Sequence, residues 1–351
     1  MADEHRLIDA HTHVAPQWAG LALRVMDRAG VSCSVNLGWQ DAYGEKLLQM
    51  LEVFNRYPGR FAQLCNIDWS LIGRPDFGKR AADSLEKAVE AGAKGLKVFK
   101  NLGLEIRTEN GDLLRVDDRR LDPLFESAGR LGVPVLIHTA DPFWFWRPLG
   151  RHNFWSGVLE GSYAQWSYYR KGMPSREELL GERDNLVARH RGTTFVAPHL
   201  LGLADDPLAF EETLEAHPNL YADISARLPA MVRTEKRREL WRGILIRFAE
   251  RVLFGTDLIY LDQDVATGIQ SQSFQPPGDL DLGSLSPEES YEETSVKYTE
   301  AHVRFLSSDQ TQPEAPFRRQ KGTFALPGLG LPEDVLDKIL YQVPAKVYHL
   351  S

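Results

Sequence analysis

The sequence predicts an α/β fold, a (β/α)8 TIM barrel, from three observations. Eight short apolar runs recur along residues 6–258, stretches with helical periodicity separate them, and several runs end in a histidine or an aspartate. Alternating strands and helices fold as parallel strands with right-handed crossovers, and eight such units match a closed barrel better than an open sheet. We therefore treat residues 1–351 as one domain, with the barrel over 6–258 and an insert and C-terminal helices over 259–351.

The eight runs are rich in apolar and β-branched residues and are too short to be helices, which is typical of buried strands. In chain order they span residues 6–14, 32–37, 61–69, 95–99, 133–139, 194–200, 220–225 and 252–258.

The stretches between the runs show the pattern of helices packed on one face. In residues 77–91, for example, Leu85 and Ala88 fall on the apolar side of a helix with 3.6 residues per turn. Gly30 and Gly132 stand just before the next strand, where a glycine commonly ends a helix.

The tail does not follow this rhythm. Residues 272–287 are rich in Pro, Gly and Ser, a helix is predicted over 291–306, and the residues from there to 331 are predicted to be loose. A terminal helix should begin at Pro332 and be interrupted at Pro344. The insert is either a solvated loop region or a lid or subunit contact.

Composition and charge restrict the class of function. A formal net charge of −8 and a pI near 5.7 argue against nucleic-acid and membrane partners and fit a small-molecule substrate. No apolar run is long enough to span a bilayer, and the polar, acidic start lacks the features of a secretory signal. Cys33 and Cys65 lie in apolar runs, so we expect buried packing residues and a cytoplasmic location.

Four histidines and one aspartate stand at the ends of predicted strands. The first run ends in His11 and His13, the fifth in His138, the sixth in His199 and the eighth in Asp257. Each histidine alone would be interpreted as a core residue, but the C-terminal ends of barrel strands meet at one mouth. Polar groups buried together there are costly unless they are hydrogen-bonded or bound to a metal. Nitrogen ligands with one carboxylate suit Zn²⁺ first, and also Mn²⁺, Fe²⁺, Co²⁺ or Ni²⁺.

On these residues the chain resembles the amidohydrolase superfamily. The family pattern is His-x-His on strand one, Lys or Glu on strand four, His on strands five and six, and Asp on strand eight. Residues 134–141 and 255–257 are similar to the branch called amidohydrolase 2, which includes aminocarboxymuconate-semialdehyde decarboxylase, resorcylate-type decarboxylases and a pyrone-dicarboxylate lactonase. Barrels of this branch often pair, so a homodimer is one option for this chain.

The resemblance implies one divalent ion and a separate catalytic histidine. His11, His13, His138 and Asp257 would hold the metal, and His199 would act on the substrate as a base or an electrophile. Lys97 takes the fourth-strand position, and three roles stay open for it. It pairs with a neighbouring aspartate or supports the site, it binds a substrate anion, or it is carboxylated and bridges two metals.

The expected chemistry follows from these roles. A bound metal lowers the pKa of water from 15.7 to roughly 7, Asp257 would move the proton and His199 would polarise the substrate carbonyl. Our leading prediction is hydrolysis of a C–N or C–O bond in a small, cyclic or acidic substrate. The alternative is non-oxidative decarboxylation of an aromatic or unsaturated acid, and a barrel that binds metal without turnover is a third class.

The loop after the fifth run suggests contacts with the substrate. Aromatic residues, Trp144 and Trp146 among them, crowd residues 143–169. They form either a small core of the loop itself or an aromatic wall for a flat, acidic substrate. Arg227, after the seventh run, either grips a substrate carboxylate or pairs with Asp223.

Overall fold

The computed structural model describes residues 7–153, 155–161, 163–268, 282–315 and 324–350. The strands around the barrel are β1 (Leu7–Val14), β2 (Val31–Asn36), β3 (Phe61–Gln63), β4 (Leu96–Val98), β5 (Val135–Ile137), β6 (Phe195–Ala197), β7 (Leu220–Asp223), β8 (Val252–Leu253) and β9 (Leu258–Tyr260). Within these described ranges, no helix is both long enough and apolar enough to cross a membrane.

The strands form two parallel sheets that hydrogen bonds join at both seams. One sheet has the order β3-β2-β1-β9 and the other β4-β5-β6-β7-β8. At the seam between β3 and β4, the backbone N–H of Lys97 donates to the carbonyl oxygen of Cys65 (2.8 Å). At the seam between β8 and β1, the backbone N–H of Ala10 donates to the carbonyl oxygen of Phe254 (3.0 Å). The strands therefore make a ring in which β8 and β9 are two parts of the eighth strand, and the predicted fold class is confirmed.

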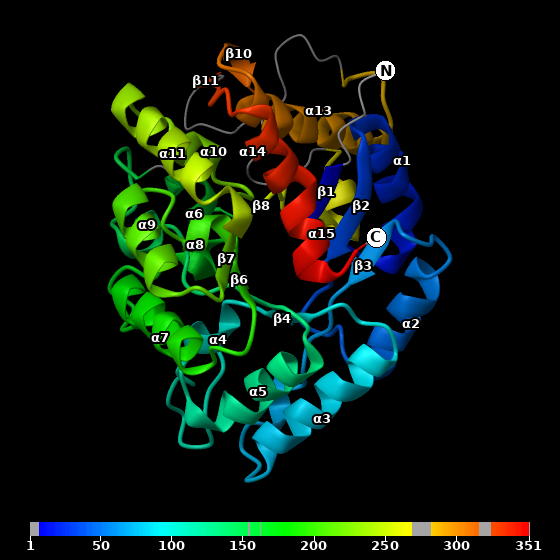
Figure 1. The fold of residues 1–351 in the computed structure, drawn as a ribbon, viewed down its shortest axis with the longest axis vertical. Coiled ribbons are helices and arrows are strands. Elements are labelled where there is room, and N and C mark those ends of the chain that lie inside the picture. The colour runs from blue at the N-terminus through cyan, green and yellow to red at the C-terminus, as the bar shows by residue number, and fades with distance from the viewer. Residues whose placement is uncertain (1–6, 154, 162, 269–281, 316–323, 351) are drawn as a thin grey trace.

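Eight helices stand between and outside these strands (Figure 1). They are α1 (Ala19–Ala29), α2 (Gly44–Phe54), α3 (Phe77–Glu90), α5 (Asp122–Leu131), α7 (Arg176–Arg189), α9 (Pro207–Ala216), α11 (Glu235–Arg247) and α13 (Pro287–Ser307). The glycines expected to end helices do so, since Gly30 (φ 73°) and Gly132 (φ 68°) take the left-handed conformation after α1 and α5.

The helix expected in the tail, α13, packs against the first helix of the ring. Arg24 of α1 pairs with Glu288 of α13 at 2.6 Å, and Arg28 of α1 pairs with Glu292 of α13 at 3.1 Å. Figure 1 shows the two helices side by side. The structure thus places α13 within the ring of helices, and the long segment before it is the loop that follows the eighth strand. The Pro/Gly/Ser-rich part of that loop lies largely outside the described residues.

Two expectations about the tail are wrong in detail. Residues 307–331 are not wholly loose, because β10 (Thr311–Ala315) and β11 (Phe324–Pro327) pair as an antiparallel hairpin. The terminal helix is not broken at Pro344. A π-helical turn (Lys338–Gln342) joins α14 (Glu333–Asp337) to α15 (Val343–Tyr348), so the helical backbone runs on through Pro344, and the irregularity is the π turn directly before the proline.

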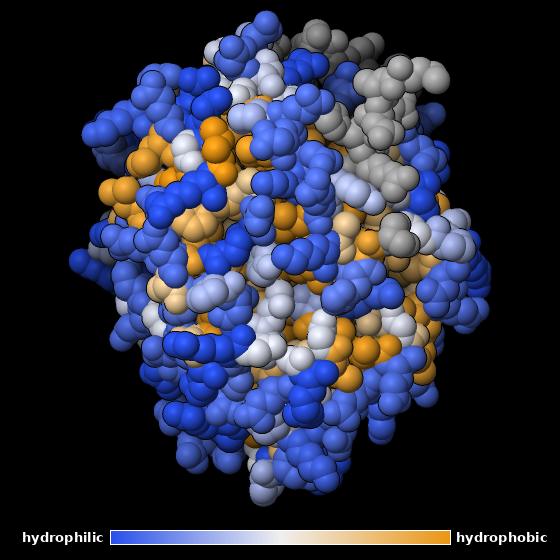
Figure 2. All heavy atoms as spheres, in the orientation of Figure 1, coloured by the Kyte–Doolittle hydropathy of each residue, from blue (hydrophilic) through white to orange (hydrophobic). Residues whose placement is uncertain are grey.

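The terminal helices close one end of the barrel. Val343, Val347 and Tyr348 pack into a cluster with Ile8 and Ala10 of β1 and other inward-facing residues of the strands. Figure 1 shows α15 in the middle of the ring, and Figure 2 shows mainly hydrophilic side chains on the same face. The N-terminal ends of the strands are therefore covered, which leaves their C-terminal ends for the site.

Both cysteines are buried, as expected. Burial raises the pKa of Cys33 to about 11 and that of Cys65 to about 12, so neither thiol is poised as a nucleophile.

Candidate metal centre

Strand β1 brings two imidazoles to the mouth of the barrel. His11 and His13 stand two residues apart on an extended segment, so both side chains leave the same face of the strand. The intervening Thr12 turns the other way, and its hydroxyl lies 2.7 Å from that of Ser34 on β2. Ile8 and Ala10 also face inward although they stand at even positions, because the pairing of β1 with β2 shifts its register between Asp9 and Thr12.

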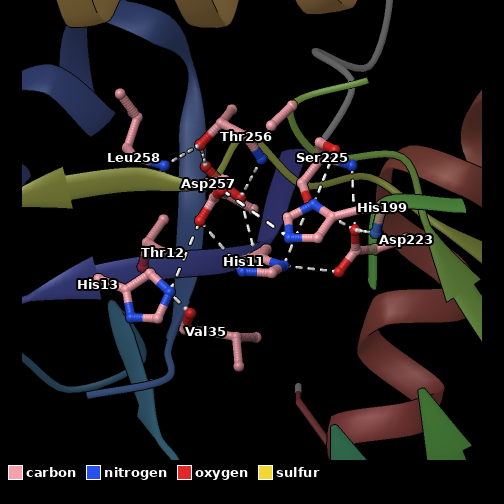
Figure 3. Close-up of polar contacts among 12 residues, drawn as sticks. His11, Thr12, His13, Val35, His199, Asp223, Ser225, Thr256, Asp257 and Leu258 are labelled. Carbon is pink, nitrogen blue, oxygen red and sulfur yellow. Dashed lines mark hydrogen bonds and ion pairs between the residues drawn. The ribbon is translucent and has the colours of Figure 1, made fainter. Parts of the chain in front are cut away.

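One nitrogen of each imidazole is held by a partner on a neighbouring element, as Figure 3 shows for His11 and Asp223. Nδ1 of His11 lies 2.7 Å from the carboxylate of Asp223, and Nδ1 of His13 lies 2.7 Å from the carbonyl oxygen of Gly38. The two Nε2 atoms face Asp257, at 3.2 Å for His11 and 3.6 Å for His13. Histidines that bind metals are oriented in this way, with the second ring nitrogen donating to an oxygen.

Asp257 is placed by an irregular break in the eighth strand. Its φ of 67° lies in the left-handed region, and its N–H donates to the carbonyl of His11 at 2.8 Å. Just before it, Gly255 passes so close to β1 that a Cβ there would lie 2.9 Å from the Cβ of His11. Thr256, between them, is held by Asp9, which accepts from its N–H (3.0 Å) and its hydroxyl (2.5 Å).

The electrostatics of this group favour a cation between the rings and the carboxylate. Burial would lower the pKa of His11, but the carboxylates of Asp223 and Asp257 raise it to about 9. Burial lowers the pKa of His13 to about 3, so its ring is neutral at neutral pH. Burial would raise the pKa of Asp257, but the imidazoles, that of His11 foremost, hold it well below its usual range.

The residues present therefore fit one divalent metal. His11, His13 and Asp257, which we call the metal group, each offer a ligand atom within 4.8 Å of the others. Neutral imidazole and carboxylate are the ligand types of Zn²⁺ and of other divalent first-row metals. The same distance limit also groups His11 with His199 and Asp223, although there Asp223 is already bonded to His11 Nδ1.

His199 sits on a strained turn beside this group. The segment α8 (Pro198–Leu201) is not a regular helix, since His199 and Leu200 have φ of 58° and 56°. The N–H of His199 donates to Asp223 at 2.9 Å, and its Nδ1 lies 3.0 Å from the carbonyl oxygen of Ser225. A left-handed conformation at a non-glycine residue persists only where the surroundings hold it, and it is commonest at functional sites.

His138 lies near the group but is not brought into it. Its ring stands edge-on to that of His199, with 4.8 Å between the ring centres. Among the described residues, the two groups of potential ligand atoms within 4.8 Å do not include it. Burial lowers its pKa well below the usual value, so the ring is neutral. The expected fourth ligand is thus next to the site, and its ligand role stays a prediction.

Lys97 is a buried cation with no direct carboxylate partner in the described part of the chain. Its side chain is 1% exposed, its Nζ lies 4.8 Å from the ring centre of Phe99, and Asp257 and Asp223 act on it only through space. Burial lowers its pKa to about 8. The ion pair considered for Lys97 is instead made by Lys100, which donates to both oxygens of Asp141 at 2.9 Å and 2.8 Å.

Arg227 does not pair with Asp223. Its guanidinium donates to the carbonyl of Ala226 at 3.0 Å and lies 5.5 Å from the ring centre of Trp155. Asp223 is engaged by His11, His199 and Ser225. Of the two roles considered for Arg227, the structure leaves the one in which it binds a substrate carboxylate.

The aromatic loop after β5 packs largely on itself. Phe145 contacts Trp155, Trp166 and Tyr168, and the ring of Trp146 lies 4.7 Å from that of Tyr168, tilted by 45°. The indole N–H of Trp146 is bonded to the carbonyl of Pro174. The guanidinium carbon of Arg233 lies 5.6 Å from the ring centre of Trp144. The small-core interpretation of the loop therefore describes Trp146, and a substrate contact for either tryptophan stays a prediction.

Sequence reasoning missed the residues that orient the candidate ligands. Asp9 lies two positions before His11, and Ser225 lies two positions after Asp223, so the strand-end pattern that revealed the histidines also contains them. Trp39 after β2 was missed as well, because nothing in its neighbourhood resembled a motif. Its ring lies 5.4 Å from that of His13.

Comparison with known proteins agrees with this fold and site. The family model described as Amidohydrolase matches residues 8–350. The family is typically metal-dependent, and its members are hydrolases and decarboxylases. No curated protein matches the sequence.

Three solved structures illustrate the similarity in fold. A 5-carboxyvanillate decarboxylase from Sphingomonas paucimobilis is 14% identical with a TM-score of 0.54, over 99% of this chain and 100% of that one. A 2,6-dihydroxybenzoate decarboxylase from Rhizobium is 13% identical with a TM-score of 0.53, over 99% of both chains. A dihydroorotase from Campylobacter jejuni is 13% identical with a TM-score of 0.53, over 99% of this chain and 84% of that one. Because the family model spans nearly the whole sequence, the chain belongs to the amidohydrolase family.

Proposed function

We propose that this protein is a metal-dependent hydrolase that cleaves a C–N or C–O bond of a small, cyclic or acidic substrate. The observation that carries the proposal is the convergence of His11 Nε2, His13 Nε2 and one Asp257 oxygen on a single point beside His199. A divalent ion bound there, most readily Zn²⁺, would activate a water molecule and polarise the substrate.

Asp257 is the group best placed to move the proton of that water. One of its oxygens faces the two imidazoles of β1, and the other lies 4.0 Å from Nε2 of His199. A carboxylate between the water and the substrate can accept the proton and then deliver it to the leaving group. Its low pKa keeps it ionised for the first of these steps.

The hydrogen bonds of His199 favour a base over an electrophile. The Ser225 carbonyl can only accept, so the proton of the neutral ring resides on Nδ1. Nε2 then presents a lone pair toward Asp257 and the substrate. Burial lowers the pKa of His199 to about 3, which keeps the ring neutral.

Lys97 and Arg227 supply the positive charge for an acidic substrate. Neither has a carboxylate partner in the described residues. The negative charge of Asp257 raises the pKa of both groups without a direct contact. A buried ammonium is costly unless an anion or carboxylation compensates it. Pairing with an aspartate is thus excluded for Lys97 in the described residues, whereas support of the site, binding of a substrate anion and carboxylation as a bridge between two metals remain as proposals.

The second candidate is non-oxidative decarboxylation, and the same two cations favour it. A carboxylate held by Lys97 and Arg227 beside the metal group could leave as CO₂, and the carbon would take a proton that Asp257 first accepts from a water molecule. The products separate the two reactions. Hydrolysis of lactones or cyclic imides releases protons, whereas decarboxylation of aryl or unsaturated acids releases CO₂.

Metal content is the first test, measured by elemental analysis of protein purified without chelator, with Lys97→Ala and Asp257→Asn as variants. About one divalent ion per chain in the wild type and in Lys97→Ala, and a loss in Asp257→Asn, supports the mononuclear site. Two ions in the wild type and a loss in Lys97→Ala supports a carboxylated bridge. No ion in the wild type after addition of zinc or manganese would overturn the proposal.

Activity is then assayed on a panel of lactones, cyclic imides and aryl acids, with proton release and CO₂ followed in parallel. Proton release that requires the metal and disappears in Asp257→Asn is the expected result. Metal-dependent CO₂ release without hydrolysis would replace the leading function by the second candidate.

A further inference from the structure

We infer that a cavity beside the metal group, between the loops that follow β1 and β2, is a subsite for an uncharged, flat ring of the substrate, recognised by Trp39. This inference rests on the proposed function only in taking the substrate as the occupant. The cavity has a volume of about 290 Å³ and its wall includes His13, Pro16, Gly38, Trp39, Met50 and Leu261. We call it the ring subsite.

The ring subsite shares a wall with the metal group. His13 lines the cavity, and its Nε2 faces Asp257 at 3.6 Å. Trp39 stands edge-on to His13, with 5.4 Å between ring centres and 77° between the planes, and lies 5.6 Å from Phe99. A ring in this cavity would therefore place its substituent next to the reacting atoms.

The loop that carries Trp39 is held in position by the metal group itself. The carbonyl of Gly38 accepts from Nδ1 of His13, and Gly38 has a φ of 62° that a side chain would strain. A Cβ at Gly38 would also lie 2.8 Å from the Cβ of Ala42, and the N–H of Ala42 donates to the carbonyl of Trp39 at 3.0 Å. The cavity is thus preformed rather than created by its ligand.

Trp39 leaves apolar surface available for a ligand. It is 41% exposed, which is unusual for a large aromatic residue placed over a buried site. Ligand sites commonly combine such an aromatic wall with a few polar groups. Stacking or edge contact with a flat ring would bury this surface.

The volume of the cavity and the charges at its rim determine which kind of ring it can accept. An apolar cavity of about 150 Å³ holds benzene, so 290 Å³ accommodates one ring with a small substituent but is at the low end for larger ligands. The charged residues at the rim, Asp41 and Lys46, are exposed and pair with each other. They leave no net charge there, so the acidic group of the substrate belongs on the side of Lys97 and Arg227.

The test uses 4-fluorobenzyl alcohol as a neutral ring probe and follows its ¹⁹F line width on titration with metal-free protein. Trp39→Ala removes the aromatic wall, Met50→Trp fills the cavity, and Leu48→Ala is the matched control, because Leu48 is exposed on α2 and does not line the cavity. Circular dichroism verifies that each variant is folded.

The expected result is saturable broadening in the wild type and in Leu48→Ala. Binding should be at least about 5-fold weaker in Trp39→Ala, in keeping with the loss of an aromatic contact, and absent in Met50→Trp. Equal broadening in all four proteins, or none in the wild type, would overturn the inference. Because the readout needs neither metal nor turnover, its failure is distinct from a failure of the proposed hydrolysis.

Discussion

The imidazole of His11 and the carboxylate of Asp223, which come from β1 and β7, are joined inside the barrel by a hydrogen bond of 2.7 Å between Nδ1 and Oδ2. Both side chains are buried, at 1% and 0% exposure. This bond fixes the ring of His11 so that Nε2 points to Asp257. Asp223 also accepts from the N–H of His199, so one carboxylate positions two members of the site.

Asp223→Asn should weaken metal binding by about 10- to 100-fold, because an amide neither fixes the imidazole tautomer nor strengthens the ligand in the same way. The measurement is the Kd for Zn²⁺ in competition with a chromophoric chelator. Asp206→Asn is the control, since Asp206 caps α9 and asparagine caps equally well. An unchanged Kd in Asp223→Asn would show that His11 does not depend on this partner.

Gly255→Ala should displace His11 and lower the free energy of unfolding by about 1 to 3 kcal/mol, because the new Cβ would lie 2.9 Å from the Cβ of His11. Gly243→Ala in α11 is the matched control. A Cβ there meets nothing within 4 Å, and it should gain about 0.5 to 1 kcal/mol. Urea unfolding and the Kd for Zn²⁺ report both effects. Equal stability in the two variants would contradict the close approach of β8 to β1.

Arg183→Met should loosen the turn that carries His199. Arg183 is 1% exposed and donates to the carbonyl of Leu201 at 2.6 Å. This carbonyl belongs to the turn at residues 199–201, in which each left-handed residue costs roughly 1 to 2 kcal/mol. We expect a loss of about 2 to 3 kcal/mol in urea unfolding, since a buried carbonyl loses a charged donor. The ring resonances of His199 should shift in ¹⁵N NMR, whereas the exposed Arg191→Met should change neither quantity. A stability loss with unmoved His199 resonances would limit Arg183 to a structural role.

His302 in α13 should make the fold sensitive to mild acid. Burial lowers its pKa from 6.5 to about 4, and its Nδ1 donates to the carbonyl of Tyr298. Between these pH values the unfolded chain binds more protons, so its contribution is present above pH 6.5 and is lost as the pH falls to 4. The loss is on the order of 3 kcal/mol.

The measurement is urea unfolding of metal-free protein from pH 7 to pH 4. His302→Gln should flatten the decline in the free energy of unfolding, and His152→Gln, at an exposed position, should not. Parallel declines in the wild type and in His302→Gln would assign the acid sensitivity to other groups.

The strand ends could be predicted from the sequence because a period of two and a run of apolar residues are local properties. His11, His13, His199 and Asp257 were found in this way, and the structure brings them together. The bond from His11 to Asp223 could not be predicted, since it joins residues 212 positions apart and depends on the diameter of the ring.

The tail was harder for a related reason. The place of α13 in the ring depends on contacts with α1, at the other end of the chain, and not on its own periodicity. The hairpin of β10 and β11 has few β-branched residues, so its pairing gave no strand pattern. The same applies to the break in the eighth strand, where tertiary contacts rather than propensity hold Asp257 in a left-handed conformation.

Strand β1 serves two separate purposes along its length. Ile8 and Ala10 pack against the terminal helices, whereas His11 and His13 face the mouth. Variation in α15 can therefore tune how firmly the barrel holds together while the donor atoms stay where they are. An engineer seeking a more durable protein would begin at Val347 and Tyr348, and one seeking a new substrate would begin at Trp39.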